Sequence, residues 1–276
     1  MIRRPIPLAL LALLAACAPE GEELTVVDSS DQYVVEIQQV DFAYVMPTQI
    51  PSGWVTFRAP NEGAEHHVAV FLKLPEGVTQ ADWYEAMADP YTAREREWWA
   101  ALEDAGGTGV VAPGGTAQTT IWMTPGLYGV ICGVIAEDGT SHWVHGMHTT
   151  FEVTTENSGA LEPVPDIHLA LGSSGFEQEG EIIAGTRTVA VHFADQSSDR
   201  THDVHVARLE EGESLESVIQ LMSHAKEPFP VSFVGGAEQA PEGRTDYFTV
   251  TFEPGRYAWV CHLHAETGMA HEFVVH

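Results

Sequence analysis

The chain contains two segments in which the same residue types recur in the same order, and this repeat limits the fold more than any other feature. Each segment starts with a histidine before a strand-like run, passes through Gly-Gly, and reaches a Pro-Gly turn that is followed by cysteine and then methionine. The first segment contains His67, Gly114-Gly115, Pro125-Gly126, Cys132 and Met147, and the second contains His202, Gly235-Gly236, Pro254-Gly255, Cys261 and Met269. Matching features in one order predict two domains of one fold.

Short runs rich in Val, Thr, Phe, Tyr and Trp alternate with Gly/Pro turns along both segments. Examples are residues 33–40, 68–72, 119–122 and 247–252. In the last of these, every second residue is apolar, which is the period of a half-buried strand. Short strands at this spacing predict antiparallel β-sandwiches.

Two stretches with a helical pattern, 79–104 and 213–225, interrupt the strands, one in each repeat between its histidine and its Gly-Gly. Residues 155–165 contain Gly, Ser, Asn and Pro and have the composition of a linker. We therefore predict an all-β fold of two tandem domains, 32–154 and 166–276, with short helical insertions.

The N-terminus has the form of an export signal. A short basic start leads into the apolar run 5–16, which is too short to span a bilayer as a helix. Small residues directly before Cys17 resemble the lipobox of bacterial lipoproteins, which implies a signal peptide over 1–16 and a lipid on Cys17. Ordinary signal cleavage nearby, with an incidental Cys17, is the alternative. Residues 17–31 are predicted to form a flexible tether.

The balance of charges excludes one class of partner. The chain has 40 Asp and Glu against 12 Lys and Arg, a formal net charge of −28. Nucleic acid repels such a protein, so we predict that it does not bind nucleic acid.

In the second repeat, one cysteine is followed by histidine and methionine at the spacing Cys261-x2-His264-x4-Met269, and His202 precedes an upstream strand. These residues offer one thiolate, two imidazoles and one thioether. A trigonal His2Cys set with a weak axial Met is the ligand set of an electron-transfer copper site. A buried cysteine that packs as a small hydrophobic residue is the structural alternative.

This spacing resembles the plastocyanin branch of the cupredoxins, the blue copper proteins, and the resemblance covers both repeats. It implies two tandem cupredoxin-like Greek-key β-sandwiches, with one type 1 copper ion in each domain. It also implies that His202, Cys261, His264 and Met269 are the ligands in the second domain.

The first repeat has the same residue types with a longer loop, at the spacing Cys132-x9-His142-x4-Met147. By the resemblance, these three residues and His67 are the ligands of the first domain. His66 competes with His67, and His145 competes with His142. A first domain that binds no copper also remains an alternative.

The resemblance implies an electron carrier that is exported and held by a lipid anchor on the periplasmic or extracellular face of the cell envelope. Its partner would be another redox protein, and the acidic surface suits a basic c-type cytochrome. One alternative is a two-domain copper oxidase or nitrite reductase-like enzyme, which needs a histidine directly before the cysteine, where this chain has Ile131 and Val260. The others are a copper-binding or delivery protein without a redox role and a metal-free interaction sandwich.

Overall fold

The computed structural model describes residues 27–29, 32–89, 92–196, 201–222, 226–229 and 231–276. The predicted signal peptide 1–16 and Cys17 lie outside the described residues. Within the predicted tether, Val27–Ser29 forms a strand that pairs with Gln32–Glu36. Regular structure within the described residues therefore begins before residue 32.

The first half of the chain consists mostly of strands. The elements are β1 (Val27–Ser29), β2 (Gln32–Glu36), β3 (Gln38–Val40), β4 (Ala43–Val45), β5 (Gln49–Pro60), β6 (His67–Lys73), α1 (Gln80–Ala88), η1 (Ala93–Glu95), η2 (Trp99–Ala101), β7 (Glu103–Val111), β8 (Thr116–Met123), β9 (Gly126–Ile131) and β10 (His148–Asn157).

The second half repeats this plan. Its elements are β11 (Ile167–Gly172), β12 (Gly175–Glu179), β13 (Gly185–Phe193), β14 (Val204–Leu209), α2 (Leu215–Met222), β15 (Ser232–Ala237), β16 (Thr245–Phe252), β17 (Gly255–Val260), η3 (Ala265–Thr267) and β18 (Ala270–Val275). None of the helices in the described part of the chain is long and apolar enough to cross a membrane.

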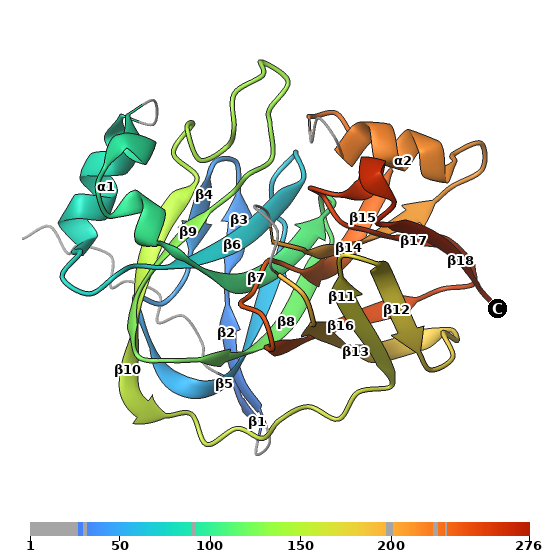
Figure 1. Cartoon of the computed structure of the whole chain (residues 1–276), viewed down its shortest axis with the longest axis horizontal. Helices are drawn as coiled ribbons and strands as arrows, with labels where there is room; N and C mark the ends of the chain where they lie inside the picture. The colour runs from blue at the N-terminus through green and yellow to red at the C-terminus, as the bar shows by residue number, and fades with distance from the viewer. Residues whose placement is uncertain (1–26, 30–31, 90–91, 197–200, 223–225, 230) are drawn as a thin grey trace, which may run out of the picture.

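The strands form two layers, and each layer runs through both halves of the chain (Figure 1). One layer has the order β2-β5-β8-β16-β13-β11-β12, and the other has the order β10-β9-β6-β7-β15-β14-β17-β18. The halves meet where β8 pairs with β16 and β7 pairs with β15. Two sandwiches are thus joined edge to edge in both layers.

Each sandwich has its own apolar core between the two layers. Phe57 of β5 packs on Phe71 of β6 in the first half, with ring centroids 4.7 Å apart. Phe248 of β16 and Trp259 of β17 occupy the corresponding space in the second half. Alternating apolar residues on facing strands account for both cores, and the predicted all-β fold of two sandwiches is confirmed.

The strand pairing is mixed, whereas the sequence predicted antiparallel sheets. The pairs β2–β5, β5–β10 and β11–β13 are parallel. Parallel neighbours need a connection that crosses from one edge of the fold to another. The spacing of short strands carries no signal for such crossovers.

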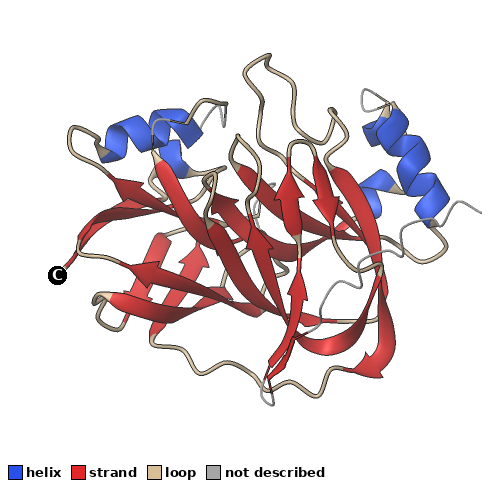
Figure 2. Cartoon of the chain, turned by 180° about the vertical axis from the view of Figure 1, so that it is seen from behind, coloured by secondary structure: helices blue, strands red, loops and turns tan. Residues whose placement is uncertain are grey.

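The helical stretches are shorter than predicted and lie at the flanks of the strand layers (Figure 2). Thr79 caps α1: its hydroxyl accepts from the backbone N–H of Asp82, and the Asp82 carboxylate accepts from the backbone N–H of Thr79. The stretch 79–104 then breaks into η1 and η2, and its last two residues already belong to β7. In the other stretch, α2 ends at Met222.

The Gly-Gly pair that matches Gly235-Gly236 is not the one that the sequence comparison chose. Gly107 opposes Val70 of β6, and Gly236 opposes the equivalent position of β14. A Cβ on Gly107 would lie 2.0 Å from the carbonyl oxygen of Ala69, and one on Gly236 would lie 2.0 Å from that of Val204. Gly106-Gly107 is therefore the structural counterpart, since both pairs serve a close approach between neighbouring strands, and Gly114-Gly115 belongs to a later turn.

Candidate metal centres

In the second half, three ligand atoms converge at one end of the sandwich. His202 lies just before β14, Cys261 directly follows β17, and His264 precedes η3. The two imidazole Nδ1 atoms are 3.1 Å apart, and the Cys261 Sγ lies 3.5 Å from the Nδ1 of His264 and 4.0 Å from that of His202. We call this group the second site.

The first half builds the same triangle, which we call the first site, from His67, Cys132 and His142. Its Nδ1 atoms are 3.2 Å apart, and the Cys132 Sγ lies 3.4 Å from the Nδ1 of His142 and 4.0 Å from that of His67. Ligands at about 2.0–2.3 Å from one ion, as for imidazole and thiolate on zinc, lie about 3–4 Å apart when they surround it roughly in a plane. Both triangles have the size that a single metal ion requires.

Each predicted methionine is held beside its site by backbone hydrogen bonds. In the first half, the N–H of Cys132 donates to the carbonyl of Met147, and the N–H of Met147 donates to the carbonyl of His142. In the second half, Cys261, Met269 and His264 repeat both bonds. Both methionines are buried. That they are axial ligands stays a prediction.

A glycine with left-handed backbone precedes each methionine. Gly146 and Gly268 both have φ of 112°. A residue with a Cβ is strained in that conformation, so glycine lets the chain turn back from the histidine to the methionine. The shared turn explains why the spacing His-x4-Met is the same in both halves although the loops before the histidine differ in length.

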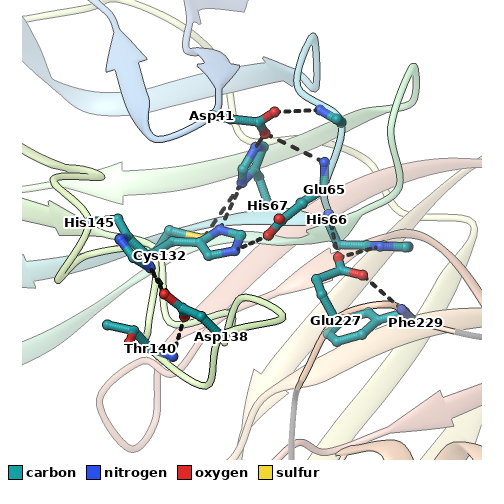
Figure 3. Close-up of polar contacts among 12 residues, drawn as sticks. Asp41, Glu65, His66, His67, Cys132, Asp138, Thr140, His145, Glu227 and Phe229 are labelled. Carbon is teal, nitrogen blue, oxygen red and sulfur yellow. Dashed lines mark hydrogen bonds and ion pairs between the residues drawn. The ribbon is translucent and has the colours of Figure 1, made fainter.

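The competing histidines are turned elsewhere. The Nδ1 of His66 lies 2.8 Å from the Oε1 of Glu227, and the Nε2 of His145 lies 3.2 Å from the Oδ2 of Asp138. Figure 3 draws both contacts. His67 and His142 are the histidines that the fold brings to Cys132. His66 lies just before β6, where its backbone N–H and its ring both contact Glu227, whereas His67 is the first residue of the strand.

Burial disfavours the charged forms of both thiols and of His67, His142 and His202. Burial raises the pKa of the Cys132 thiol to about 12 and lowers the pKa of His142 to about 4. Burial likewise raises the pKa of Cys261 and lowers the pKa values of His67 and His202. A metal ion must therefore displace one thiol proton at each site, and its binding strengthens as pH rises.

Two carboxylates hold the outer nitrogens of the first site (Figure 3). The Nε2 of His67 lies 2.8 Å from the Oδ1 of Asp41, and the Nε2 of His142 lies 2.8 Å from the Oε2 of Glu65. An ionised carboxylate only accepts hydrogen bonds, so each neutral ring carries its proton on Nε2. Both Nδ1 lone pairs then point at each other and at sulfur, an arrangement that favours a cation between them.

A hairpin covers the first site. Phe42, in the turn between β3 and β4, packs edge-on against the ring of His142 at 4.8 Å between centroids and stacks on His145 at the same distance. The hydroxyl of Tyr44 donates to the carbonyl of Val68, directly after His67. All three residues of the first site are buried, whereas His264 of the second site is partly exposed. The second site is thus the more accessible of the two.

A third group, which the sequence analysis did not find, lies between the halves. It consists of Asp203, His205 and Glu238, all buried. When the two halves are aligned by strand register, these three residues match Val68, Val70 and Gly109 of the first half, in that order. Burial, and then the charges of Asp203 and Asp104, raise the pKa of Glu238 well above its ordinary value.

The third group is not arranged as a resident metal site. The backbone N–H of Val110 donates to the Nδ1 of His205, so the neutral ring carries its proton on Nε2. That nitrogen faces Asp203 Oδ1 at 3.5 Å and Glu238 Oε1 at 3.7 Å. A metal ligand needs a free lone pair at this atom, so the first and second sites remain the candidates for metal binding.

The chain is similar to several solved copper proteins. Reduced auracyanin from Roseiflexus castenholzii is 21% identical over 44% of this chain and 96% of its own, with a TM-score of 0.27. Rusticyanin from Thiobacillus ferrooxidans is 21% identical over 40% and 75%, with a TM-score of 0.27. A multicopper oxidase is 15% identical over 89% and 90%, also with a TM-score of 0.27.

A scan against protein-family models and a search of curated proteins found no match. The chain is an all-β protein with two sandwiches, each of which brings one cysteine and two histidines together at one end.

Proposed function

We propose that the protein is an electron carrier that binds one type 1 copper ion in each domain. The observation that carries the proposal is the repeated triangle of two Nδ1 atoms and one Sγ. Its sides are 3.2, 3.4 and 4.0 Å in the first site and 3.1, 3.5 and 4.0 Å in the second. A buried cysteine that only packed as a hydrophobic residue would not face two imidazole nitrogens in both halves.

The chain's own residues determine how such a site would work. Copper supplies one-electron chemistry, and Cys132 and Cys261 would give it a thiolate that binds both oxidation states. The histidines are fixed on strand ends and short loops, so the ligands change little when the charge of the site changes. Burial keeps water from the first site, while the partly exposed His264 offers the second site a route to a partner.

Copper titration of the metal-free mature protein tests the proposal. We expect two copper ions per chain and an intense blue thiolate-to-copper absorption band, because each site offers one thiolate. Paramagnetic resonance should show two type 1 signals. A colourless copper complex would contradict the electron-carrier proposal and favour copper storage or delivery. A third copper ion with a different resonance signal would favour the copper oxidase.

We also propose that the protein is exported and held at the membrane by a lipid on Cys17. The order of a basic start, an apolar run and small residues before Cys17 supports this. Replacing Cys17→Ala should move the protein from the membrane fraction to the soluble fraction, because the lipid has no sulfur to attach to. Fractionation of cells that produce each form measures this. If the Cys17→Ala protein is cleaved after its signal peptide and still stays in the membrane fraction, the lipid anchor is contradicted.

The partner that suits the surface is a basic redox protein such as a c-type cytochrome. The net charge of −28 favours association with a positively charged surface at low salt. The rate of electron transfer to such a cytochrome should then fall as ionic strength rises, since salt screens the attraction.

A further inference from the structure

In the first site, each ligand histidine is also bound through the ring nitrogen that faces away from Cys132. Asp41 lies in the turn between β3 and β4, and Glu65 lies in the loop before β6, so neither is near Cys132 in sequence. Yet each places one carboxylate oxygen 2.8 Å from the Nε2 of a ligand histidine. Two separate segments of the chain thus each supply one carboxylate to one imidazole of the same site.

We propose that Asp41 and Glu65 form a carboxylate clamp that fixes both imidazoles of the first site in the metal-binding tautomer and lowers the reduction potential of the copper bound there. This inference rests on the proposed copper site of the first domain. Asp41 and Glu65 are positioning residues, because they act through His67 and His142.

The clamp is built into the backbone. The N–H of Ala64 donates to the Oδ2 of Asp41 at 2.8 Å, which aims Oδ1 at His67. The side chains of Asp41 and Glu65 are 31% and 29% exposed, so a conservative change at either leaves the core intact.

The effect on the potential follows from charge. A carboxylate on Nε2–H makes the imidazole a stronger donor at Nδ1 and adds negative charge near the ion. Both effects stabilise Cu(II), which carries two positive charges, more than Cu(I), which carries one. The clamp should therefore shift the first site toward Cu(II), and its removal should shift it toward Cu(I).

The test uses Asp41→Asn and Glu65→Gln, which remove the charge and keep the size, in full-length protein that carries Cys261→Ser so that only the first site contributes. Removing an outer partner costs about 10–100-fold in metal affinity. We expect the ratio of Cu(II) to Cu(I) affinity to fall about tenfold for each change, a rise in potential of about 59 mV for one electron.

Asp138→Asn is the matched control, because Asp138 lies near the same site but contacts the non-ligand His145. It should leave the potential and the affinity ratio unchanged. In the Cys132→Ser background, Asp41→Asn should not move the potential of the second site. If Asp41→Asn fails to fold, Glu65→Gln alone decides, since its loop position lies outside the sheets.

The results separate the clamp from the copper site itself. Blue copper at the first site with a potential and affinity ratio equal to those of the parent protein, in the Asp41→Asn/Glu65→Gln double variant, would overturn the clamp. A rise in potential that Asp138→Asn reproduces would also overturn it, because the effect would then be general surface charge. Absence of blue copper in the Cys261→Ser parent would refute the proposed function of the first domain instead.

Discussion

Replacing Cys261→Ser is expected to remove one of the two bound copper ions and about half of the blue absorption, because each domain would supply one thiolate. The serine hydroxyl keeps its proton at neutral pH and is a poor donor to copper. With serine at position 261, the Nδ1 atoms of His202 and His264, which are 3.1 Å apart, have no thiolate beside them. Visible absorption and metal content per chain measure the loss.

Cys132→Ser is the matched variant and should remove the other half of the signal, since the first site has the same geometry. The double variant should be colourless. A Cys132→Ser protein with unchanged colour and copper content would show that the first domain binds no type 1 copper. Unchanged colour in Cys261→Ser would contradict the assignment of the second site.

Replacing Gly109→Ala should destabilise the protein strongly, by about 3 kcal/mol, because it forces two strands apart. An added Cβ would lie 2.4 Å from the backbone nitrogen of Gly236 and 2.5 Å from the carbonyl carbon of Gly235. Both contacts are backbone, and they lie where β7 pairs with β15, so the junction between the halves must open. We expect a melting temperature lower by about 6–12 °C in calorimetry.

Gly172→Ala is the control for this change. Gly172 ends β11, and a Cβ there would lie 3.5 Å from the Cβ of Asp195, an ordinary van der Waals contact. It should melt close to the unchanged protein. If Gly109→Ala has the same melting temperature as Gly172→Ala, the stability of the protein does not depend on the close approach of β7 and β15.

The sequence predicted the fold class and the residues that meet at both sites because their signals are local. Cys261 and His264 lie in one loop, and the strand after His202 is marked by its own composition. His67 could be chosen over His66 only through the match between repeats, and the structure gives the physical reason, since His66 contacts Glu227 before β6 begins at His67.

The contacts that the sequence analysis missed are those between distant segments. Asp41 and Glu65 reach the first site from loops with no motif, and acidic residues are too frequent in this chain for two of them to stand out. The Gly-Gly match failed because two glycine pairs lie in the same part of the first repeat, and only the register of β7 shows which one meets β6. The pairing of β7 with β15 and of β8 with β16 has no sequence motif in either repeat.

The two layers that pass unbroken from one sandwich to the other have a consequence for any attempt to produce one half alone. An isolated first half would present β7 and β8 as open edges, with rows of free N–H and C=O groups. Such edges recruit whatever strand is available, and a second copy of the same half offers a strand of the same length and twist. A lone half is therefore expected to assemble with itself, whereas in the whole chain β15 and β16 cover these edges.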